Sequence, residues 1–518
     1  MNIKYTVYVS LIVALGGFLM GFDASVISGV VKFIEPQFDL TKIQLGWSVS
    51  CLTLTATLAM LMAGPLSDKF GRRSVLKYAA ILYFISALGS ALAPSFTLLV
   101  LARMLGGFGV GASLIIAPVY IAEIAPSKHR GTMVSFNQLN IVLGISVAFF
   151  TNYLILQWGK SDANWATYLQ FNNYNWRWML GLEALPAIIY FFSLFFVPRS
   201  PRWLAMNGLN EEALHVMQKS LGEEEAKIQL DSICKSIQSS PKKERVSFRE
   251  LFKPSMKLVM LIGIVIAVTQ QITGINSVFF YAPMIFEQTG IGTDASFSQA
   301  ILVGLINLVF TLFAIWFVDR VGRKPLLIFG LAGIAISMFI LSTGFGQATY
   351  QLTEKNIQEC VSIVGAEDLS SMKNVTFQSD LEFNEALKNS VSAQVFKEHQ
   401  TEFISKAISI NPWLVLVGIL GFVASFAISI GPVMWVLFSE LFPNRIRGVA
   451  ISFVGLVNSG ISFLVQLVFP WEQMNFGNAT TFLLYGLFGL FGLIFVFFLL
   501  PETKGKSLEE LEVILVKE

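Results

Sequence analysis

Three amide side chains stand close together in a segment that is otherwise apolar enough to cross a membrane. Gln270, Gln271 and Asn276 follow the apolar run 258–268. Each amide offers two N–H donors and one carbonyl acceptor, and polar groups are costly inside a bilayer unless a ligand or another helix uses them. Such a group of amides is suited to binding a neutral molecule that carries many hydroxyl groups. The alternative is that the amides hold neighbouring helices together, and this segment alone leaves both interpretations open.

One carboxylate also falls inside an apolar segment. Asp23 lies in the run 16–29, well within the first long apolar stretch. An isolated carboxylate in the hydrocarbon costs ~3 kcal/mol or more unless it is paired or protonated. The nearest candidate partner is Arg103, which lies in another apolar stretch. Asp23 is therefore interpreted either as a group that gains and loses a proton or as half of a static ion pair between two helices.

The composition indicates a membrane protein. The chain has 518 residues, of which 54% are hydrophobic and 14% charged, whereas a soluble protein carries about 25% charged residues. A helix needs about 20 residues to cross the hydrocarbon. Twelve apolar stretches of that length recur, at about 6–30, 43–66, 75–93, 96–120, 133–156, 177–198, 256–289, 298–319, 325–345, 411–438, 449–470 and 478–500. The first has no small-residue cleavage site, so we expect it to be retained as a helix.

Basic residues gather in the short connections that follow alternate apolar stretches. Arg72 follows the second stretch, Arg130 the fourth, Arg323 the eighth and Arg447 the tenth, and 199–257 is also rich in lysine and arginine. Positive residues are enriched on the cytoplasmic side of membrane proteins. We therefore expect these loops and both termini to lie in the cytoplasm, in a multi-pass protein of the plasma membrane.

The chain repeats itself in two halves. Three motifs recur after corresponding apolar stretches, pairing 64–73 with 319–324, 118–131 with 431–448, and 198–202 with 501–505. A repeat of six helices plus six, with a substrate site between the halves, is a known plan of membrane transporters. We expect four parts: a six-helix half at 1–198, a cytoplasmic helical linker at 199–255, a second six-helix half at 256–500 and a short cytoplasmic tail at 501–518.

The second half contains an insertion. The interval between its first two motifs is longer than in the first half, and the additional residues coincide with the polar stretch 346–410, which has acids and lysines but no arginine. We expect a small, ordered external cap that is dispensable for transport. In the linker, 200–253 has apolar residues at helical spacing, which predicts short amphipathic helices.

These motifs, which occur in order between matching apolar stretches, resemble the sugar porter family of the major facilitator superfamily. The resemblance covers nearly the whole chain except 346–410. It is strongest to bacterial proton-coupled symporters for xylose and glucose, and extends to mammalian facilitative glucose transporters. It implies an all-α membrane protein with twelve transmembrane helices in two six-helix pseudo-repeat halves. The implied function is transport of a monosaccharide by alternating access as sugar:proton symport, with a facilitative uniporter of the same pocket as the alternative.

The resemblance also assigns roles to residues of the pocket. It implies that sugar is bound by Gln138, Gln270, Gln271, Asn276, Trp435 and Asn458, and that Phe280 and Tyr281 form an external gate. Amides can pair with sugar hydroxyls, while an indole covers the apolar face of a sugar ring. For Asn458 a helix contact is equally open. Thr273-Gly274 would unwind the helix locally, and the apolar residues Ile145 and Phe279 favour a hexose such as glucose or galactose over a pentose.

Charged residues are assigned to proton coupling and to a cytoplasmic latch. The resemblance implies that Asp23, Arg103 and Glu183 couple the proton. The implied latch, which would hold the outward-facing state through pairs across the two halves, consists of Asp68, Arg72, Arg73, Glu123, Arg130, Asp319, Arg323, Glu440 and Arg447. These charges would also fix the orientation in the membrane. Arg199 departs from the family pattern, which has glutamate there.

Other chemistry is not indicated by the sequence. The glycine-rich stretch 106–111 lies in an apolar helix with no preceding strand, so it predicts close helix packing rather than a phosphate site. His129, His215 and His399 are dispersed, and no set of residues resembles a metal site or an activated nucleophile. We therefore expect a protein that is not an enzyme and has no cofactor or metal. Its partners would be sugar, protons and the lipid bilayer, without nucleic acid, and it would act as a monomer.

Overall fold

The computed structural model describes residues 3–126, 129–238, 248–358, 369–443, 446–504 and Glu510. Its contacts divide the chain into two compact units. The first unit comprises Met1–Val26, Cys51–Ala148 and Arg177–Glu250, and the second comprises Ile27–Ser50, Phe149–Trp176 and Leu251–Glu518. Several helices pass from one unit to the other, so this division differs from the boundaries predicted at 198 and 255, which stay a prediction.

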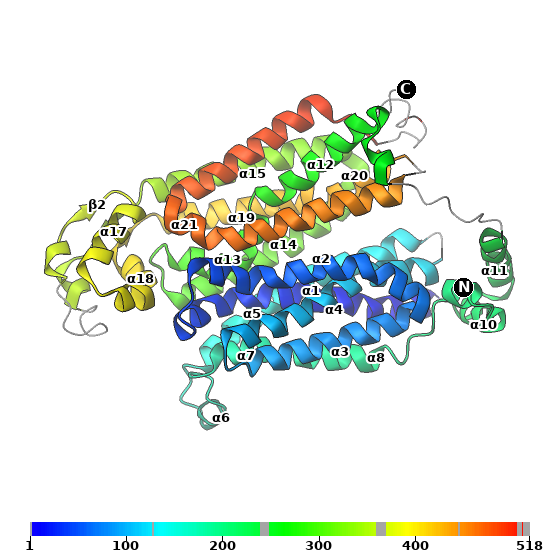
Figure 1. The fold of residues 1–518 in the computed structure, drawn as a ribbon, viewed down its shortest axis with the longest axis horizontal. Coiled ribbons are helices and arrows are strands. Elements are labelled where there is room, and N and C mark those ends of the chain that lie inside the picture. Colours follow the sequence, from blue (N-terminus) through cyan, green and yellow to red (C-terminus); the bar gives the residue numbers. More distant parts are fainter. Residues whose placement is uncertain are drawn as a thin grey trace. The chain divides into compact units, whose positions relative to one another are not determined.

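The described chain up to residue 238 is helical, with short connections (Figure 1). Its helices are α1 (Ile3–Gln37), α2 (Lys42–Phe70), α3 (Arg72–Ala91), α4 (Phe96–Ile124), α5 (Arg130–Trp158), α6 (Asn164–Tyr168), α7 (Asn175–Gly181), α8 (Ala184–Ser193), α9 (Pro201–Met206), α10 (Asn210–Leu221) and α11 (Glu223–Gln238). Within the first unit, α3 packs against α4 and α8.

The chain from residue 248 onward adds three short strands to a set of helices. Its elements are the 3₁₀ helices η2 (Phe248–Phe252), η3 (Pro254–Met256) and η4 (Ser370–Met372), the strands β1 (Thr349–Gln351), β2 (Thr376–Phe377) and β3 (Ile408–Ser409), and the helices α12 (Lys257–Ile272), α13 (Ile275–Glu287), α14 (Thr293–Val321), α15 (Arg323–Gly346), α17 (Asp380–Ser390), α18 (Ala393–Ala407), α19 (Pro412–Ile428), α20 (Ile430–Leu441) and α21 (Arg447–Leu499). Within the second unit, α15 packs against α19 and α21, and α12 also packs against α21.

The membrane-spanning helices agree with the predicted all-α architecture. In the described chain, 10 helical stretches are long and apolar enough to cross a membrane. One of them, α21, has 53 residues and is interrupted at Gly477, where φ is 75°, so it covers two of the predicted spans. The sixth predicted span is covered by α7 and α8, which are separated by two residues. The structure is therefore consistent with twelve spans.

Glycines bring α4 and α2 into close contact. A Cβ on Gly107 would lie 2.0 Å from the Oγ1 of Thr55 and 2.5 Å from the carbonyl oxygen of Leu52, and one on Gly111 would lie 2.2 Å from that of Ala56. Real Cβ atoms do not approach other atoms so closely, so only glycine permits this helix separation. The helix-packing role predicted for the glycine-rich stretch is confirmed.

The insertion folds into an ordered body with its own apolar core. Its strands form an antiparallel sheet in the order β2-β1-β3, beside α17 and α18 (Figure 1). Phe383, Leu387 and Phe403 are buried in the core, and the ring of Tyr350 stacks on that of Phe383 at 5.7 Å. The predicted order of the insertion is confirmed for its described residues, while its external location stays a prediction.

The linker forms the short helices that its apolar spacing predicts. Helices α9, α10 and α11 pack on one another, and α9 also contacts α4. A small apolar cluster of Met217, Leu221 and Ala226 joins α10 to α11. Residues 239–247 of the linker lie outside the described residues.

Replacing Gly107 with alanine is predicted to destabilise the protein. The added methyl group would meet the backbone of α2, which cannot rotate away, and overpacking of this kind costs about 1–3 kcal/mol. The melting temperature in detergent should therefore fall. Gly64→Ala is the matched control, because no atom lies within 4 Å of a Cβ built on Gly64 in α2. An equal melting temperature for Gly107→Ala and the parent protein would contradict the close packing.

Candidate functional site

The amide segment lies at a break between two helices. Helix α12 ends at Ile272 and α13 begins at Ile275. Between them, Gly274 has a φ of 90° and a ψ of 19°, the left-handed region that favours glycine. A Cβ on Gly274 would also lie 2.3 Å from the ring of Tyr485. The local unwinding predicted at Thr273-Gly274 is therefore present, and it divides the seventh span into two helices.

The amides around this break form one hydrogen-bonded cluster. The Nε2 of Gln271 donates to the Oε1 of Gln270 at 3.1 Å and to the Oδ1 of Asn458 at 3.2 Å. The Nδ2 of Asn276 donates to the Oε1 of Gln271 at 2.7 Å and to the Oγ of Ser462 at 2.6 Å. Four of the predicted sugar-binding residues are thus brought together within the second unit, from α12, α13 and α21.

The amides differ in their hydrogen-bond partners, and two of them bond to helix backbone. Gln270 donates to the carbonyl oxygens of Ile430 and Gly431 at 3.1 and 3.2 Å, at the start of α20. Asn458 donates to the carbonyl oxygen of Ala267 at 2.9 Å, in α12. Both residues therefore fasten helix backbones together, as the alternative interpretation of the amides requires.

Gln271 and Asn276 are different, because within the described chain their amides bond to side chains alone. Side chains can rotate, whereas a helix backbone cannot. These two residues can therefore exchange their present partners for the hydroxyl groups of a ligand without separating helices. The sequence alone did not distinguish them from Gln270 and Asn458.

An aromatic side chain near the start of α20 remains accessible. Trp435 is 47% exposed, and its ring packs edge-on against Phe438 at 6.0 Å. Gly455 lies under the indole, since a Cβ there would be 3.9 Å from it. An indole that is packed against its own helix bundle on one side and exposed on the other is suited to covering the apolar face of a sugar ring.

The remaining predicted pocket residues are placed on α5 and α13. Gln138 lies on α5 in the first unit, where its side chain is exposed and makes no hydrogen bond to the described residues. Phe280 and Tyr281 are buried in α13. The hydroxyl of Tyr281 donates to the carbonyl oxygen of Gln466 at 3.1 Å, so this predicted gate residue is fastened to α21.

Asp23 is buried beside Arg103, the partner that the sequence indicated. The Nη1 of Arg103 donates to the Oδ1 of Asp23 at 3.5 Å, and each residue is 1% exposed. The other oxygen of Asp23 has no hydrogen-bond partner among the described residues. The bond is at the outer limit of hydrogen-bond length, so this buried pair is only loosely joined.

Close helix packing brings this pair together. A Cβ on Gly21 of α1 would lie 1.9 Å from the carbonyl oxygen of Ile141 in α5, and one on Gly106 of α4 would lie 2.8 Å from the Oδ2 of Asp23. Glycines on both sides therefore let α1 approach its neighbours and let the carboxylate lie against α4.

Glu183 is the second buried acid of the first unit. It is 2% exposed and precedes α8, at the break between α7 and α8. Its Oε1 has no hydrogen-bond partner among the described residues, and its charge interacts with those of Asp23 and Arg103. The three residues predicted to couple the proton therefore form one electrostatic cluster.

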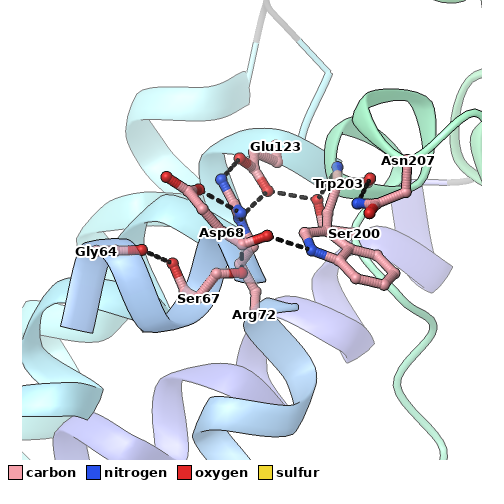
Figure 2. Close-up of polar contacts among 8 residues, drawn as sticks. All are labelled: Gly64, Ser67, Asp68, Arg72, Glu123, Ser200, Trp203 and Asn207. Atoms are coloured by element: carbon pink, nitrogen blue, oxygen red, sulfur yellow. Dashed lines mark hydrogen bonds and ion pairs between the residues drawn. The ribbon is translucent and has the colours of Figure 1, made fainter. Parts of the chain in front are cut away.

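The first repeated motif forms a compact cluster around Arg72 (Figure 2). The guanidinium donates to both carboxylate oxygens of Glu123 at 3.1 and 3.2 Å and to the Oδ1 of Asp68 at 2.8 Å. The hydroxyl of Ser200 donates to the same Glu123 carboxylate. Trp203 donates its indole N–H to the carbonyl oxygen of Asp68 at 2.9 Å. The cluster joins α2, α3 and α4 to the start of α9.

The second half repeats this arrangement. The Nη2 of Arg323 donates to the Oε1 of Glu440 at 2.7 Å, and the hydroxyl of Thr503 donates to the other oxygen of Glu440 at 2.7 Å. The carboxylate of Glu502 accepts the backbone N–H groups of Arg323 and Lys324, each at 3.1 Å. The internal repeat predicted from the motifs is thus visible in the contacts.

The two clusters differ at one position. Glu502 caps the first N–H groups of α15 beside Gly322, whose φ is 105°. The equivalent residue of the first half is Arg199, and its guanidinium lies 3.7 Å from Glu212 instead. Arg199 is the residue at which the sequence departs from the family pattern. In its place the second half has a carboxylate that caps a helix, whereas Arg199 forms a surface ion pair with α10.

The family resemblance implied Arg130, Arg323 or Arg447 as the partners of Glu123 and Glu440, and one of the two glutamates has a different partner. Glu123 bonds to Arg72 and Glu440 bonds to Arg323, each within its own unit. Arg130 is exposed at the start of α5. Arg72 follows Gly71 and Arg323 follows Gly322, and both glycines have a positive φ. Each of these arginines reaches the glutamate of its own half. The sequence alone could not identify these pairs, because several arginines have similar spacing.

The other predicted latch residues contact backbone. Arg73 donates to the carbonyl oxygen of Phe195 at 3.3 Å. Arg447 donates to that of Phe442 at 3.0 Å. The side chain of Asp319 lies outside the described residues.

Sequence reasoning missed several members of these clusters. Ser462 belongs to the amide cluster, and the Nε2 of Gln466 donates to the Oγ of Ser462 at 2.8 Å. Together with Asn458 they recur every fourth residue in an apolar span, which places them on one helix face. This spacing could have identified them. Ser200 and Thr503 occupy matching places in the third repeated motif, which also could have indicated a shared role.

Comparisons with known proteins agree with this architecture. A family model described as "Sugar (and other) transporter" matches residues 9–366 and 393–515. The chain is 33% identical to an arabinose-proton symporter of Bacillus subtilis over 100% of this chain and 96% of that protein. It is 34% identical to a D-xylose-proton symporter of Escherichia coli over 99% of this chain and 96% of that protein.

A solved structure agrees as well. The inward-open conformation of the xylose transporter from Escherichia coli superposes with a TM-score of 0.74 at 31% identity, over 98% of this chain and 99% of that chain. The family match, the sequence identities and the fold therefore all point to one group. The chain belongs to the sugar transporter family, the sugar porters of the major facilitator superfamily.

Proposed function

We propose that this protein transports a monosaccharide together with a proton by alternating access. One observation carries the proposal: the chain combines an amide cluster, two of whose members can exchange partners, with a loosely joined acid–arginine pair buried in a membrane bundle. Relatives named as arabinose–proton and xylose–proton symporters support the same coupling.

Sugar would bind through Gln271 and Asn276. Their present hydrogen bonds to side chains keep the amides satisfied when the site is empty, and sugar hydroxyls replace these bonds on binding. Gln138 and Trp435 add a further amide and an indole face. A site built to bond hydroxyl groups discriminates strongly against molecules that lack them, which favours sugars over apolar solutes.

The proton would be carried by Asp23. Protonation neutralises this carboxylate and removes the attraction to Arg103, and release of the proton restores it. The separation of the two groups therefore controls whether the proton stays, because an ionised carboxylate buried without a partner is unfavourable. Glu183 lies in the same electrostatic cluster and is the second candidate for the proton.

The cytoplasmic clusters would act as latches. Partly exposed ion pairs such as Arg323–Glu440 contribute ~0–1 kcal/mol each, so a small set of them can hold helix ends together and still separate in every cycle. We propose that the termini and these clusters lie in the cytoplasm and that the chain acts as a monomer in the plasma membrane.

The sugar can be identified by uptake. The comparisons do not support the hexose preference inferred from Ile145 and Phe279, because these relatives are named for arabinose and xylose. Labelled glucose, galactose, xylose and arabinose should be offered to proteoliposomes with and without an inward proton gradient. The proposal predicts that at least one of them accumulates only with the gradient. Uptake of none would contradict transport of a monosaccharide.

Gln271→Ala and Asn276→Ala are predicted to weaken sugar binding without unfolding the protein. Each variant loses hydrogen bonds worth about 0.5–1.5 kcal/mol, so affinity should fall by about three- to tenfold in a tryptophan fluorescence titration. Trp435→Ala, measured by calorimetry, should cost at least as much because the ring face is lost.

Asn475→Ala is the control for this series. Asn475 is an exposed amide of α21 that bonds to its own helix, so its loss should leave affinity unchanged. If both Gln271→Ala and Asn276→Ala keep parental affinity but melt at a lower temperature, the cluster only joins helices.

Asp23→Asn is predicted to uncouple transport from the proton. Asparagine imitates the protonated form and leaves the amide cluster intact, so the variant should bind sugar and exchange it across the membrane but not concentrate it under a pH gradient. Asp231→Asn, at an exposed pair with Lys235 in the linker, should concentrate sugar normally. Parental accumulation by Asp23→Asn would move the proton site elsewhere, with Glu183 the next residue to test.

A further inference from the structure

The family model leaves residues 367–392 unmatched, yet the helix within them contacts the membrane bundle. Asp380 is the first residue of α17, and its Oδ2 accepts the backbone N–H of Asn478 at 2.9 Å and the side-chain amide at 3.2 Å. A Cβ on Gly477 would lie 2.5 Å from the Oδ1 of Asp380. The interruption of α21 at this glycine therefore makes room for the carboxylate of the insertion.

The contact continues to the end of α13. The Oδ1 of Asn478 accepts from the Nε2 of Gln473 at 2.7 Å, and the same nitrogen lies 3.4 Å from the Oε1 of Gln288, which follows α13 directly. The three amide residues are only 5%, 7% and 9% exposed. A buried chain of hydrogen bonds thus connects Asp380 to the far end of the helix that carries Asn276.

A second contact joins the insertion to the same helix end. A Cβ on Gly290, three residues beyond α13, would lie 3.0 Å from the carbonyl oxygen of Ser405 and 3.0 Å from a methyl group of Ile408. The end of α18 and the strand β3 therefore pack directly against this turn. The insertion holds the end of α13 at two separate points.

The mechanical consequence follows from the break at Gly274. Helix α13 is joined to α12 through this break at one end and to the insertion at the other, and between them it packs against α14 and α21. The anchor at Gln288 is the contact that holds the end of the helix farthest from the break. It therefore contributes, together with the contacts along the helix, to the position of Asn276 relative to Gln271.

The anchor is built around a half-buried carboxylate. Burial raises the pKa of the Asp380 carboxyl, while the N–H groups of Asn478 and Leu381 act in the opposite direction by bonding to the ionised form. Hydrogen bonds to an ionised carboxylate are stronger than those between neutral groups, so the ionised form of Asp380 favours the contact with Asn478.

We infer that Asp380 is a positioning residue for the sugar site, which it controls through Asn478, Gln473 and the end of α13. This inference rests on the proposed function, because it assigns the site that α13 completes to a sugar. It also departs from the expectation that the insertion is dispensable for transport.

The test measures sugar affinity of the purified full-length protein. D-xylose, L-arabinose and D-glucose are each titrated against the parent, Asp380→Ala and Asp380→Asn, with Gln271→Ala as a direct-site reference. Loss of the charged anchor should weaken binding of the preferred sugar by about three- to tenfold. Asp380→Asn keeps one acceptor oxygen and should recover most of the loss. Glu385→Ala, an exposed acid of the same helix, should bind as the parent does.

A double-mutant cycle separates positioning from general destabilisation. If Asp380 acts through the amide chain, Asp380→Ala combined with Gln473→Ala should lose no more affinity than the more damaging single variant. Hydrogen exchange at 285–289 should also rise in Asp380→Ala while exchange in α3 stays unchanged. The inference is overturned if Asp380→Ala keeps parental affinity, or if the two losses simply add, while Gln271→Ala weakens binding. No effect in Gln271→Ala would instead point to failure of the proposed sugar site.

Discussion

An ionised group inside a membrane bundle must lie beside an opposite charge, and the first unit is arranged around this requirement. Asp23 and Arg103 come from helices far apart in the chain, and their side chains meet only because glycines let those helices approach. Gly21 brings α1 against α5, and Gly106 lets the carboxylate lie on α4. The resulting bond is long, at 3.5 Å. In the proposed function, Asp23 loses its charge when it takes up a proton and regains it when the proton leaves.

The second unit buries neutral amides, and these also need partners because buried polar groups must be hydrogen-bonded. Its buried amides satisfy one another, and the cluster divides into members that hold helix backbones and members that bond to side chains alone. Gln270 fixes α12 to α20, so this framework does not depend on the bonds that Gln271 and Asn276 exchange in the proposed function. The break at Gly274 separates α13 from α12 beside these amides. The proposed function thus places the sugar site next to this break, and the insertion contacts the other end of α13.

Much of this architecture could be predicted from the sequence, since it depends on local patterns. The length of the apolar stretches predicted the spans, Thr273-Gly274 predicted the local unwinding, and the repeated motifs predicted matching clusters in the two halves. The contacts that could not be predicted are those for which the sequence offers several equivalent partners, because only the folded structure determines which partner lies close enough. The sequence offered several arginines for Glu123 and could not select Arg72. It could not divide the amides by their partners, and it gave no reason to connect Asp380 with Asn478, because neither belongs to a repeated motif.

Sugar-driven proton movement is the most direct test of the account. The protein is reconstituted into liposomes that contain a pH-sensitive dye, with the membrane potential held at zero and no pH gradient imposed. Adding the transported sugar outside should acidify the interior at a rate proportional to sugar entry, since each sugar molecule brings a proton with it. Sugar entry at the same rate with a constant internal pH would contradict proton coupling and identify the protein as a uniporter.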